Sequence, residues 1–245
     1  MTDALYTLAN PQRFTRLTDR LLPWLAVATV LALIIGQYGA WFTAPADYQQ
    51  GEAIRIKYVH VPAAWMALFG WVLMAFSALG TLVFKHPLAD VAQKAAAPIG
   101  AAFCAICLIT GSFWGKPMWG TWWVWDARLT SMLVLLLMYC GVLALWRAIE
   151  EPILAARAVS IVTLVGAINI PIIKFSVEWW STLHQPASVL RFDGPSIHIS
   201  QLWPLLVMGL AAGLLFATLM IIRMRTELLE RRLRRMALNA VHESR

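Results

Sequence analysis

Long apolar stretches alternate with short polar connections along most of the chain. Six of these stretches are long enough to cross a membrane, and they cover about residues 21–43, 61–84, 95–115, 129–146, 158–177 and 197–222. At 1.5 Å rise per residue, about 20 helical residues cross the hydrocarbon core of a bilayer. The pattern therefore predicts an all-α polytopic membrane protein in which residues 1–245 form a single six-helix domain.

The fifth apolar stretch is the least regular of the six. Asn169 and Pro171 interrupt it, and Lys174 lies near its end. Proline removes one backbone hydrogen bond from a helix, so we expect a kink at this point. The first stretch is too long for the core of a signal peptide and has no clear small-residue cleavage site behind it, so we expect it to be retained.

The segment after the sixth stretch, residues 223–245, is strongly basic. Its first part, RMRTELLERRLRRMAL, spaces apolar residues among six arginines. This pattern predicts a basic amphipathic helix in the cytoplasm. Such a helix either lies on an anionic membrane surface or extends the last span, and the sequence leaves both arrangements open.

Composition excludes an ordinary soluble protein. The chain is 60% hydrophobic and 13% charged, whereas soluble domains carry about 25% charged residues. The net charge of +7 does not indicate a nucleic-acid partner here, because most Lys and Arg residues lie on one side of the predicted spans. The termini and the turns at 85–94 and 147–157 hold 14 of the Lys and Arg residues, and the other connections hold 6. Positive residues collect on the cytoplasmic side, which places both termini there.

This topology brings three longer connections, residues 44–59, 114–128 and 178–195, to the outer face. The stretch at 114–130, which we call the tryptophan-rich segment, holds five of the 13 tryptophans: Trp114, Trp119, Trp122, Trp123 and Trp125. An interfacial belt explains scattered tryptophans but not this density. On a short helix, Trp119, Trp122 and Trp123 would share one face at i, i+3 and i+4. Such a face could cover a flat apolar group.

Two histidines on the outer connections have the same local context, His-x-Pro. They are His60, before Pro62, and His184, before Pro186, and their connections flank the tryptophan-rich segment. A porphyrin iron with two axial imidazoles needs one ligand from each side. The plainer interpretation is a pair of interfacial polar residues. His198, at the entry of the sixth span, fits that plainer interpretation better.

Charged residues near the tryptophans suggest binding rather than catalysis. Asp126 is expected to fix the loop or accept an indole N–H, not to act as a general acid. Arg128 could bind a propionate with its guanidinium, as could Arg55 or Lys116. The alternative for each cation is an interfacial side chain that reaches toward water. We predict no catalytic residue.

Other chemistry is excluded by motif. Cys104, Cys107 and Cys140 all lie in apolar runs, so they predict packing residues rather than a disulfide framework. Leu108 follows the Cys-x-x-Cys pair where a c-type haem attachment site would have His. The stretch 111–117 lacks the glycine spacing and the Ser or Thr of a phosphate-binding loop. Any energy from ATP must therefore come from another subunit.

The tryptophan-rich segment, WGTWWVWDARLT at residues 119–130, resembles the WWD signature of the haem-handling membrane proteins of bacterial cytochrome c maturation. Chain length and span number are similar to those of the haem exporter protein C (CcmC) members of the system I pathway. The motif is complete here.

The resemblance implies that haem b lies at the periplasmic face of the bacterial inner membrane. His60 and His184 would be its axial ligands, and Trp119–Asp126 its platform. It also implies delivery of haem to the periplasmic chaperone CcmE. The implied membrane partners are the small subunit CcmD and the ABC transporter subunits CcmA and CcmB.

Three other functions remain to be weighed. A b-type electron-transfer cytochrome also uses paired histidines, but usually on helices inside the bilayer, and no second pair occurs here for a relay. A solute transporter usually has internal repeats or charges at the membrane midplane, and neither is evident. A structural scaffold would use the tryptophans to dock another membrane subunit, and haem-free protein would favour it.

Overall fold

The computed structural model describes residues 10–186, 188–189, 191 and 193–243. In that part of the chain it consists of helices and connections, with an isolated β-bridge between Asp47 and Gly51 and no strand. The α-helices are α2 (Pro11–Tyr38), α3 (Lys57–Leu82), α4 (Ala89–Trp119), α5 (Ala127–Ala148), α6 (Pro152–Gly166), α7 (Asn169–Trp179) and α8 (Ile199–Glu243). A short π-helix, η1 (Gly39–Thr43), continues α2, and a 3-10 helix, η2 (Glu52–Ile56), leads into α3.

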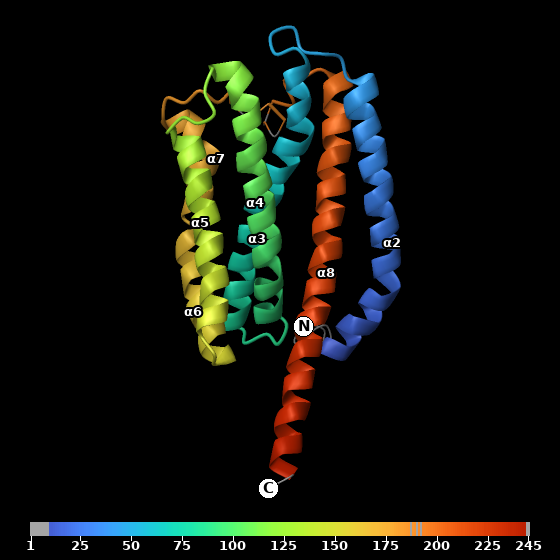
Figure 1. Ribbon diagram of the computed structural model, residues 1–245, viewed down its shortest axis with the longest axis vertical. Coiled ribbons are helices and arrows are strands. Elements are labelled where there is room, and N and C mark those ends of the chain that lie inside the picture. The colour runs from blue at the N-terminus through green and yellow to red at the C-terminus, as the bar shows by residue number, and fades with distance from the viewer. Residues whose placement is uncertain (1–9, 187, 190, 192, 244–245) are drawn as a thin grey trace.

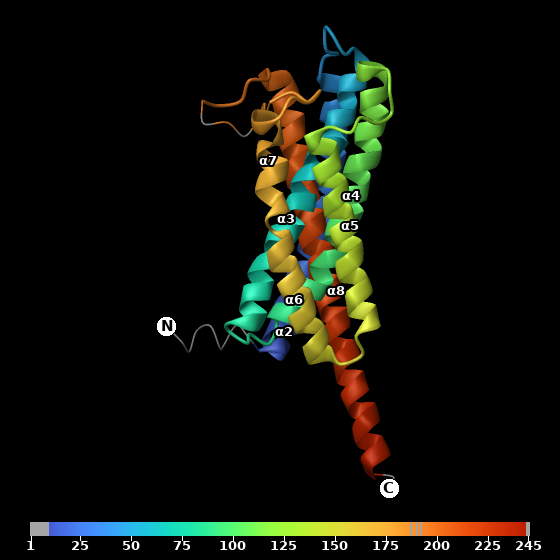
Figure 2. The same cartoon turned by 90° about the vertical axis from the view of Figure 1, so that its left-hand side faces the viewer.

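The predicted all-α membrane fold is confirmed. Within the described residues, six helical segments are long and apolar enough to cross a membrane. They run along the long axis of the molecule, with α8 between α2 and the group formed by α3 to α7 (Figures 1 and 2). Because lipid cannot satisfy backbone polar groups, helices that bond internally are the expected solution.

The two ends of the bundle differ. Residues 44–56, 120–126 and 180–198 connect helices at one end, which we call the loop end (Figure 1). The short turns at 83–88 and 149–151 and the start of α2 lie at the opposite end, and α8 continues beyond it (Figures 1 and 2). All three outer connections of the predicted topology therefore meet at the loop end.

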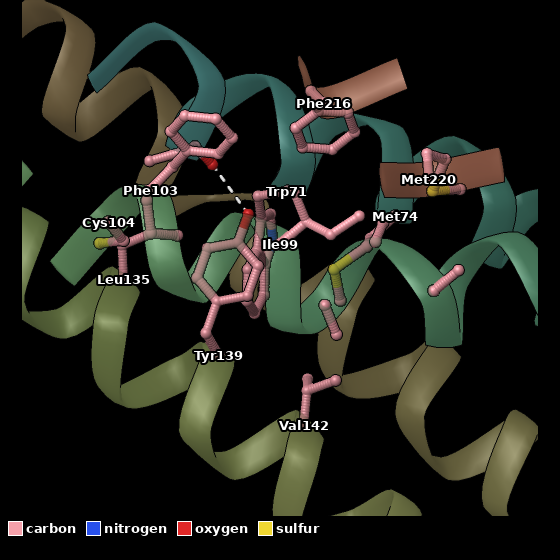
Figure 3. Packing of buried hydrophobic residues seen from close by; sticks show 14 of the residues in the cluster. Trp71, Met74, Ile99, Phe103, Cys104, Leu135, Tyr139, Val142, Phe216 and Met220 are labelled. Carbon is pink, nitrogen blue, oxygen red and sulfur yellow. Dashed lines mark hydrogen bonds between the residues drawn. The ribbon is translucent and has the colours of Figure 1, made fainter. Parts of the chain in front are cut away.

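The core is built from close helix contacts around Tyr139. This side chain is fully buried, and its hydroxyl donates a hydrogen bond of 2.8 Å to the carbonyl of Ala67 on α3 (Figure 3). Its ring meets Trp71 edge to face at 4.9 Å between centroids. Gly100 on α4 allows the approach, since a Cβ there would lie 2.2 Å from the Tyr139 hydroxyl. Helices α3, α4 and α5 are thus locked together at one level.

The expected kink in the fifth span is present. Helix α6 ends at Gly166, and α7 begins at Asn169 after two turn residues. Pro171 has no N–H to continue the helical ladder across this break. The Asn169 side chain, which is buried, donates a hydrogen bond of 2.9 Å to the carbonyl of Ser131 on α5. A hydrogen bond to α5 therefore holds the chain in place at the break.

The basic segment extends α8 along its axis, which decides between the two arrangements that the sequence left open. No glycine or proline follows Gly213 in the sequence, so nothing interrupts the helix. Four charged side chains also hold it against the start of α4. Glu227 accepts from Lys94 at 2.7 Å and from Arg231 at 2.7 Å, and Arg231 reaches Asp90 at 2.7 Å.

Replacing Gly100 with Ala is expected to destabilise the protein. The new methyl group would overlap the Tyr139 ring, and overpacking of this kind costs about 1–3 kcal/mol. Gly141→Ala is the matched control, because a Cβ there meets no atom within 4 Å. Thermal unfolding in detergent should show a lower midpoint for Gly100→Ala alone. Equal midpoints for the two variants would refute the packing argument.

Glu227→Gln should loosen α8 from α4. The carboxylate serves two cations and its side chain is only 11% exposed. The partners are partly solvated, so we expect a loss of about 1–2 kcal/mol, less than for a fully buried pair. The unfolding midpoint should fall by several degrees, whereas Glu230→Gln, an exposed neighbour, should leave it unchanged. The same midpoint in both variants would show that the ion pairs do not hold the helix.

Candidate functional site

His60 is the fourth residue of α3, at the loop end. The 3-10 helix η2 runs directly into α3 at Lys57, so Pro62 lies inside the helix. The Nδ1 atom of His60 is 3.0 Å from the carbonyl oxygen of Cys107 and 3.1 Å from the hydroxyl of Thr110, both on α4. The ring is therefore held against α4 through one nitrogen only.

A glycine gives His60 its place on α4. A Cβ at Gly111 would lie 3.0 Å from Cε1 of the imidazole. One turn further along, the Trp114 ring meets the imidazole edge to face at 5.6 Å. Trp114 is itself oriented, because its indole N–H donates a hydrogen bond of 2.9 Å to the side chain of Gln50.

His184 reaches the same end of the molecule from the non-helical connection after α7. Its Nδ1 atom is 2.9 Å from a carboxylate oxygen of Asp126, and its ring packs on Trp119 at 4.9 Å. Burial lowers the pKa of His184, and the hydrogen bond and charge of Asp126 oppose this effect. Asp126 therefore orients the ring through its Nδ1 atom.

Asp126 fixes the loop, as the sequence suggested. One carboxylate oxygen accepts the backbone N–H of Leu129 at 2.8 Å and caps the N-terminus of α5, and the other meets His184. The side chain is buried. An indole N–H was the other expected partner, but the partners found are an amide and an imidazole.

The predicted helical face of tryptophans does not form. Helix α4 ends at Trp119 because Gly120 takes a left-handed conformation with φ 74°, which favours glycine as a helix terminator. Trp122 and Trp123 follow in irregular backbone, so the i, i+3, i+4 relation is lost. The signature tryptophans instead divide between a helix end and a loop.

The loop tryptophans differ in exposure. Trp122 and Trp125 are 52% and 74% exposed. Trp123 packs against Trp125 at 5.4 Å, and its indole nitrogen is buried with no hydrogen-bond partner among the described residues. An unsatisfied buried donor costs about 1–3 kcal/mol. Within the described residues, this N–H is thus free to donate to another group.

The structure brings most of the predicted site together on the last turns of α4 and the start of α5. His60 contacts Trp114, and His184 contacts Trp119. The charge of Arg128 acts on both imidazoles, and its Nε donates to Ser176 at 3.2 Å. Both histidines engage Nδ1, and no partner for either Nε2 is found in the described part of the chain.

Arg55 has contacts of a different kind. It pairs with Glu52 and donates to the carbonyls of Ala40 and Ala44 at the end of η1. Lys116 likewise donates to the carbonyl of Gly120 at 2.9 Å. In this structure both cations stabilise helix ends. The propionate role suggested for Arg55 remains a prediction.

Several supporting residues carried no signal in the sequence. Thr110 is one polar residue in an apolar helix, and Cys107 lies nearest to His60 through its backbone carbonyl, with its sulfur 3.9 Å from Nδ1, so nothing marked either as a partner of His60. Gln50 lies far from Trp114 along the chain. Lys57 is 5% exposed and bonds to the side chain of Gln201. Only the packing of the helices reveals these pairs.

Comparison with known proteins gives a clear relationship. The family model described as heme exporter protein C matches residues 4–239. The chain belongs to the heme exporter protein C family. The resemblance carried by the tryptophan-rich segment is thereby confirmed.

Relatives with that name extend over most of the chain. The heme exporter protein C of Bradyrhizobium diazoefficiens is 62% identical over 230 residues, which cover 94% of this chain and 87% of the relative. That of Escherichia coli K12 is 48% identical, with 94% and 92% covered. A putative cytochrome c biosynthesis ccmC-like mitochondrial protein of Marchantia polymorpha is 52% identical over 182 residues, 74% of each chain.

Arg55→Ala is expected to free the connection between η1 and η2. The substitution removes charge-assisted hydrogen bonds to the carbonyls of Ala40 and Ala44, and such bonds contribute about 1.5–3 kcal/mol each at most. Hydrogen–deuterium exchange of residues 39–56 should accelerate at least about tenfold, which corresponds to 1.4 kcal/mol of local opening. Lys116→Ala should leave exchange in this segment unchanged. Slow exchange in both variants would show that Arg55 does not close the loop.

Proposed function

We propose that this protein binds haem b at the loop end and delivers it to the periplasmic chaperone CcmE for the biogenesis of c-type cytochromes. One observation carries the proposal. Two histidines from distant parts of the chain lie beside the same helix end, each with Nδ1 engaged and Nε2 unpartnered among the described residues. The name of the relatives, heme exporter protein C, supports the choice of ligand.

The residues present fit a porphyrin better than a bare metal ion. Among the described residues, no group of three or more His, Cys, Asp or Glu side chains could hold a metal. Haem supplies four nitrogen ligands of its own and needs only the two axial ones. The flat apolar ring suits Trp114, Trp119, Trp122 and Trp125, and the buried N–H of Trp123 has no partner in the described part of the chain.

Charge around the histidines supports an acidic ligand. The Arg128 guanidinium acts on both imidazoles, and a guanidinium binds a carboxylate in two-point fashion. Arg128 would therefore hold a propionate, with Arg55 as the second candidate. Asp126 takes no direct part in binding and supports His184.

The proposed role is delivery, not catalysis. Haem supplies the reactive porphyrin edge to which the chaperone becomes attached. The two imidazoles would hold the iron, and the tryptophans would support the ring. The contribution of this chain is proximity and orientation.

We propose that the loop end faces the periplasm and that the protein is a multi-pass component of the bacterial inner membrane. Lys and Arg residues concentrate at the opposite end, which is the cytoplasmic pattern. The ABC transporter subunits CcmA and CcmB would supply energy, because this chain has no phosphate-binding loop. CcmD is the expected small membrane partner.

Transfer of haem to the chaperone tests the proposal. Membranes that contain this protein and CcmE should yield haem covalently attached to CcmE. His60→Ala and His184→Ala should lower that yield at least about tenfold, because loss of metal-site residues costs this much or more. Haem staining of CcmE after denaturing electrophoresis measures the yield.

His198→Ala is the matched control. His198 also lies at the loop end and is exposed, and its side chain bonds only to Ser200 among the described residues. Its replacement should leave the yield of haem-bound CcmE unchanged. Normal yields from both His60→Ala and His184→Ala would refute the proposed function.

A further inference from the structure

Asp126 has two hydrogen-bond partners that constrain its side chain from both sides. Oδ1 accepts the N–H of Leu129 at 2.8 Å, and Oδ2 is 2.9 Å from Nδ1 of His184. An ionised carboxylate can only accept hydrogen bonds. The proton in this hydrogen bond must therefore sit on Nδ1 of His184, which leaves Nε2 as the nitrogen that can bind a metal.

This assignment does not depend on how the carboxylate is oriented, because its two oxygens are equivalent acceptors. His60 reaches the same tautomer by a different route. Its Nδ1 faces the carbonyl of Cys107 and the hydroxyl of Thr110. That hydroxyl donates its own proton to the carbonyl of Ile106 at 2.6 Å, so toward His60 it acts as an acceptor. His60 is thus oriented by a backbone carbonyl, which a substitution does not remove. His184 is oriented by one side chain, that of Asp126, which can be replaced.

We propose that Asp126 is the positioning residue that holds His184 in its iron-binding tautomer. The part that concerns iron rests on the proposed function, but the tautomer itself does not. The residue acts through His184 and does not touch the ligand. A carboxylate partner also makes the imidazole a stronger electron-pair donor to a metal than a neutral hydrogen-bond acceptor would.

The substitution Asp126→Asn separates the two roles of this side chain, which are to cap α5 and to orient His184. Asn is nearly isosteric and caps helices as well as Asp. The cap requires the amide oxygen to face the N–H of Leu129, which turns the amide NH2 toward His184. That donor forces the proton of His184 onto Nε2. Substitution of an orienting Asp by Asn leaves serine protease geometry intact but selects the wrong tautomer in the same way.

Nitrogen NMR of haem-free protein, labelled with ¹⁵N at histidine, reads the tautomer directly. The wild type should show a protonated Nδ1 at His184, with the signal assigned by its loss in His184→Ala. Asp126→Asn should show a protonated Nε2. Thr110→Val, the matched change beside His60, should leave the His184 signal unchanged. An unchanged tautomer in Asp126→Asn would overturn the proposal.

Haem-loaded protein in detergent tests the consequence for iron. Asp126→Asn should bind haem about 10–100-fold more weakly and show the absorption spectrum of His184→Ala. Added imidazole should restore six-coordinate iron in both. The double variant should be no worse than His184→Ala alone, because both changes remove one ligand. A wild-type spectrum in Asp126→Asn, or additive losses in the double variant, would overturn the ligand role.

Asp126→Ser guards against misfolding as an explanation. Serine also caps helices well but cannot reach His184 as a carboxylate does. Its unfolding midpoint should match that of the wild type, while its haem spectrum should resemble that of His184→Ala. If the wild type itself held no haem, the proposed function would fail instead, and the NMR result would still decide the tautomer.

Discussion

The hydrogen bonds of the Asp126 carboxylate are the constraint on which the loop end depends. They join the start of α5 to the connection after α7, and His184 in turn packs on the last residue of α4. The ends of two consecutive helices and a connection more than 50 residues away in the sequence are thereby joined through one buried side chain. Without that carboxylate, the N-terminus of α5 would lose its cap and His184 would lose the partner that orients it.

The helices supply the rigid frame that this loop arrangement needs. Tyr139 locks α3, α4 and α5 together, and close approach at Gly100 permits it. His60 and the two tryptophans that contact the imidazoles lie on the ends of those helices. Their positions follow from packing deep in the bundle, whereas His184 and the exposed tryptophans lie on irregular backbone. The candidate site is therefore built partly on helices and partly on irregular backbone.

Hydropathy predicted the fold because a bilayer leaves the backbone few options. The kink at Asn169 and Pro171 was also readable, since proline cannot continue the helical ladder. The face formed by Trp119, Trp122 and Trp123 was predicted wrongly. Gly120 ends the helix there. A glycine in such a position can either terminate a helix or lie inside one, and the surrounding structure decides which.

The supporting contacts of the site could not be predicted from the sequence, for a different reason. The bond from His60 to the carbonyl of Cys107 depends on how α3 and α4 pack, and a backbone carbonyl has no sequence signature. The pairing of Asp126 with His184 joins residues 58 positions apart. Residue type suggested which side chains bear chemistry, but only the fold decides which of them meet.

We propose that His60 and His184 are the two axial ligands of haem iron. The electron paramagnetic resonance spectrum of the oxidised, haem-loaded protein is the decisive test. We expect a low-spin signal typical of two imidazole ligands in the wild type and its replacement by a high-spin signal in both His60→Ala and His184→Ala. A low-spin signal that survives unchanged in either variant would rule out that residue as an iron ligand.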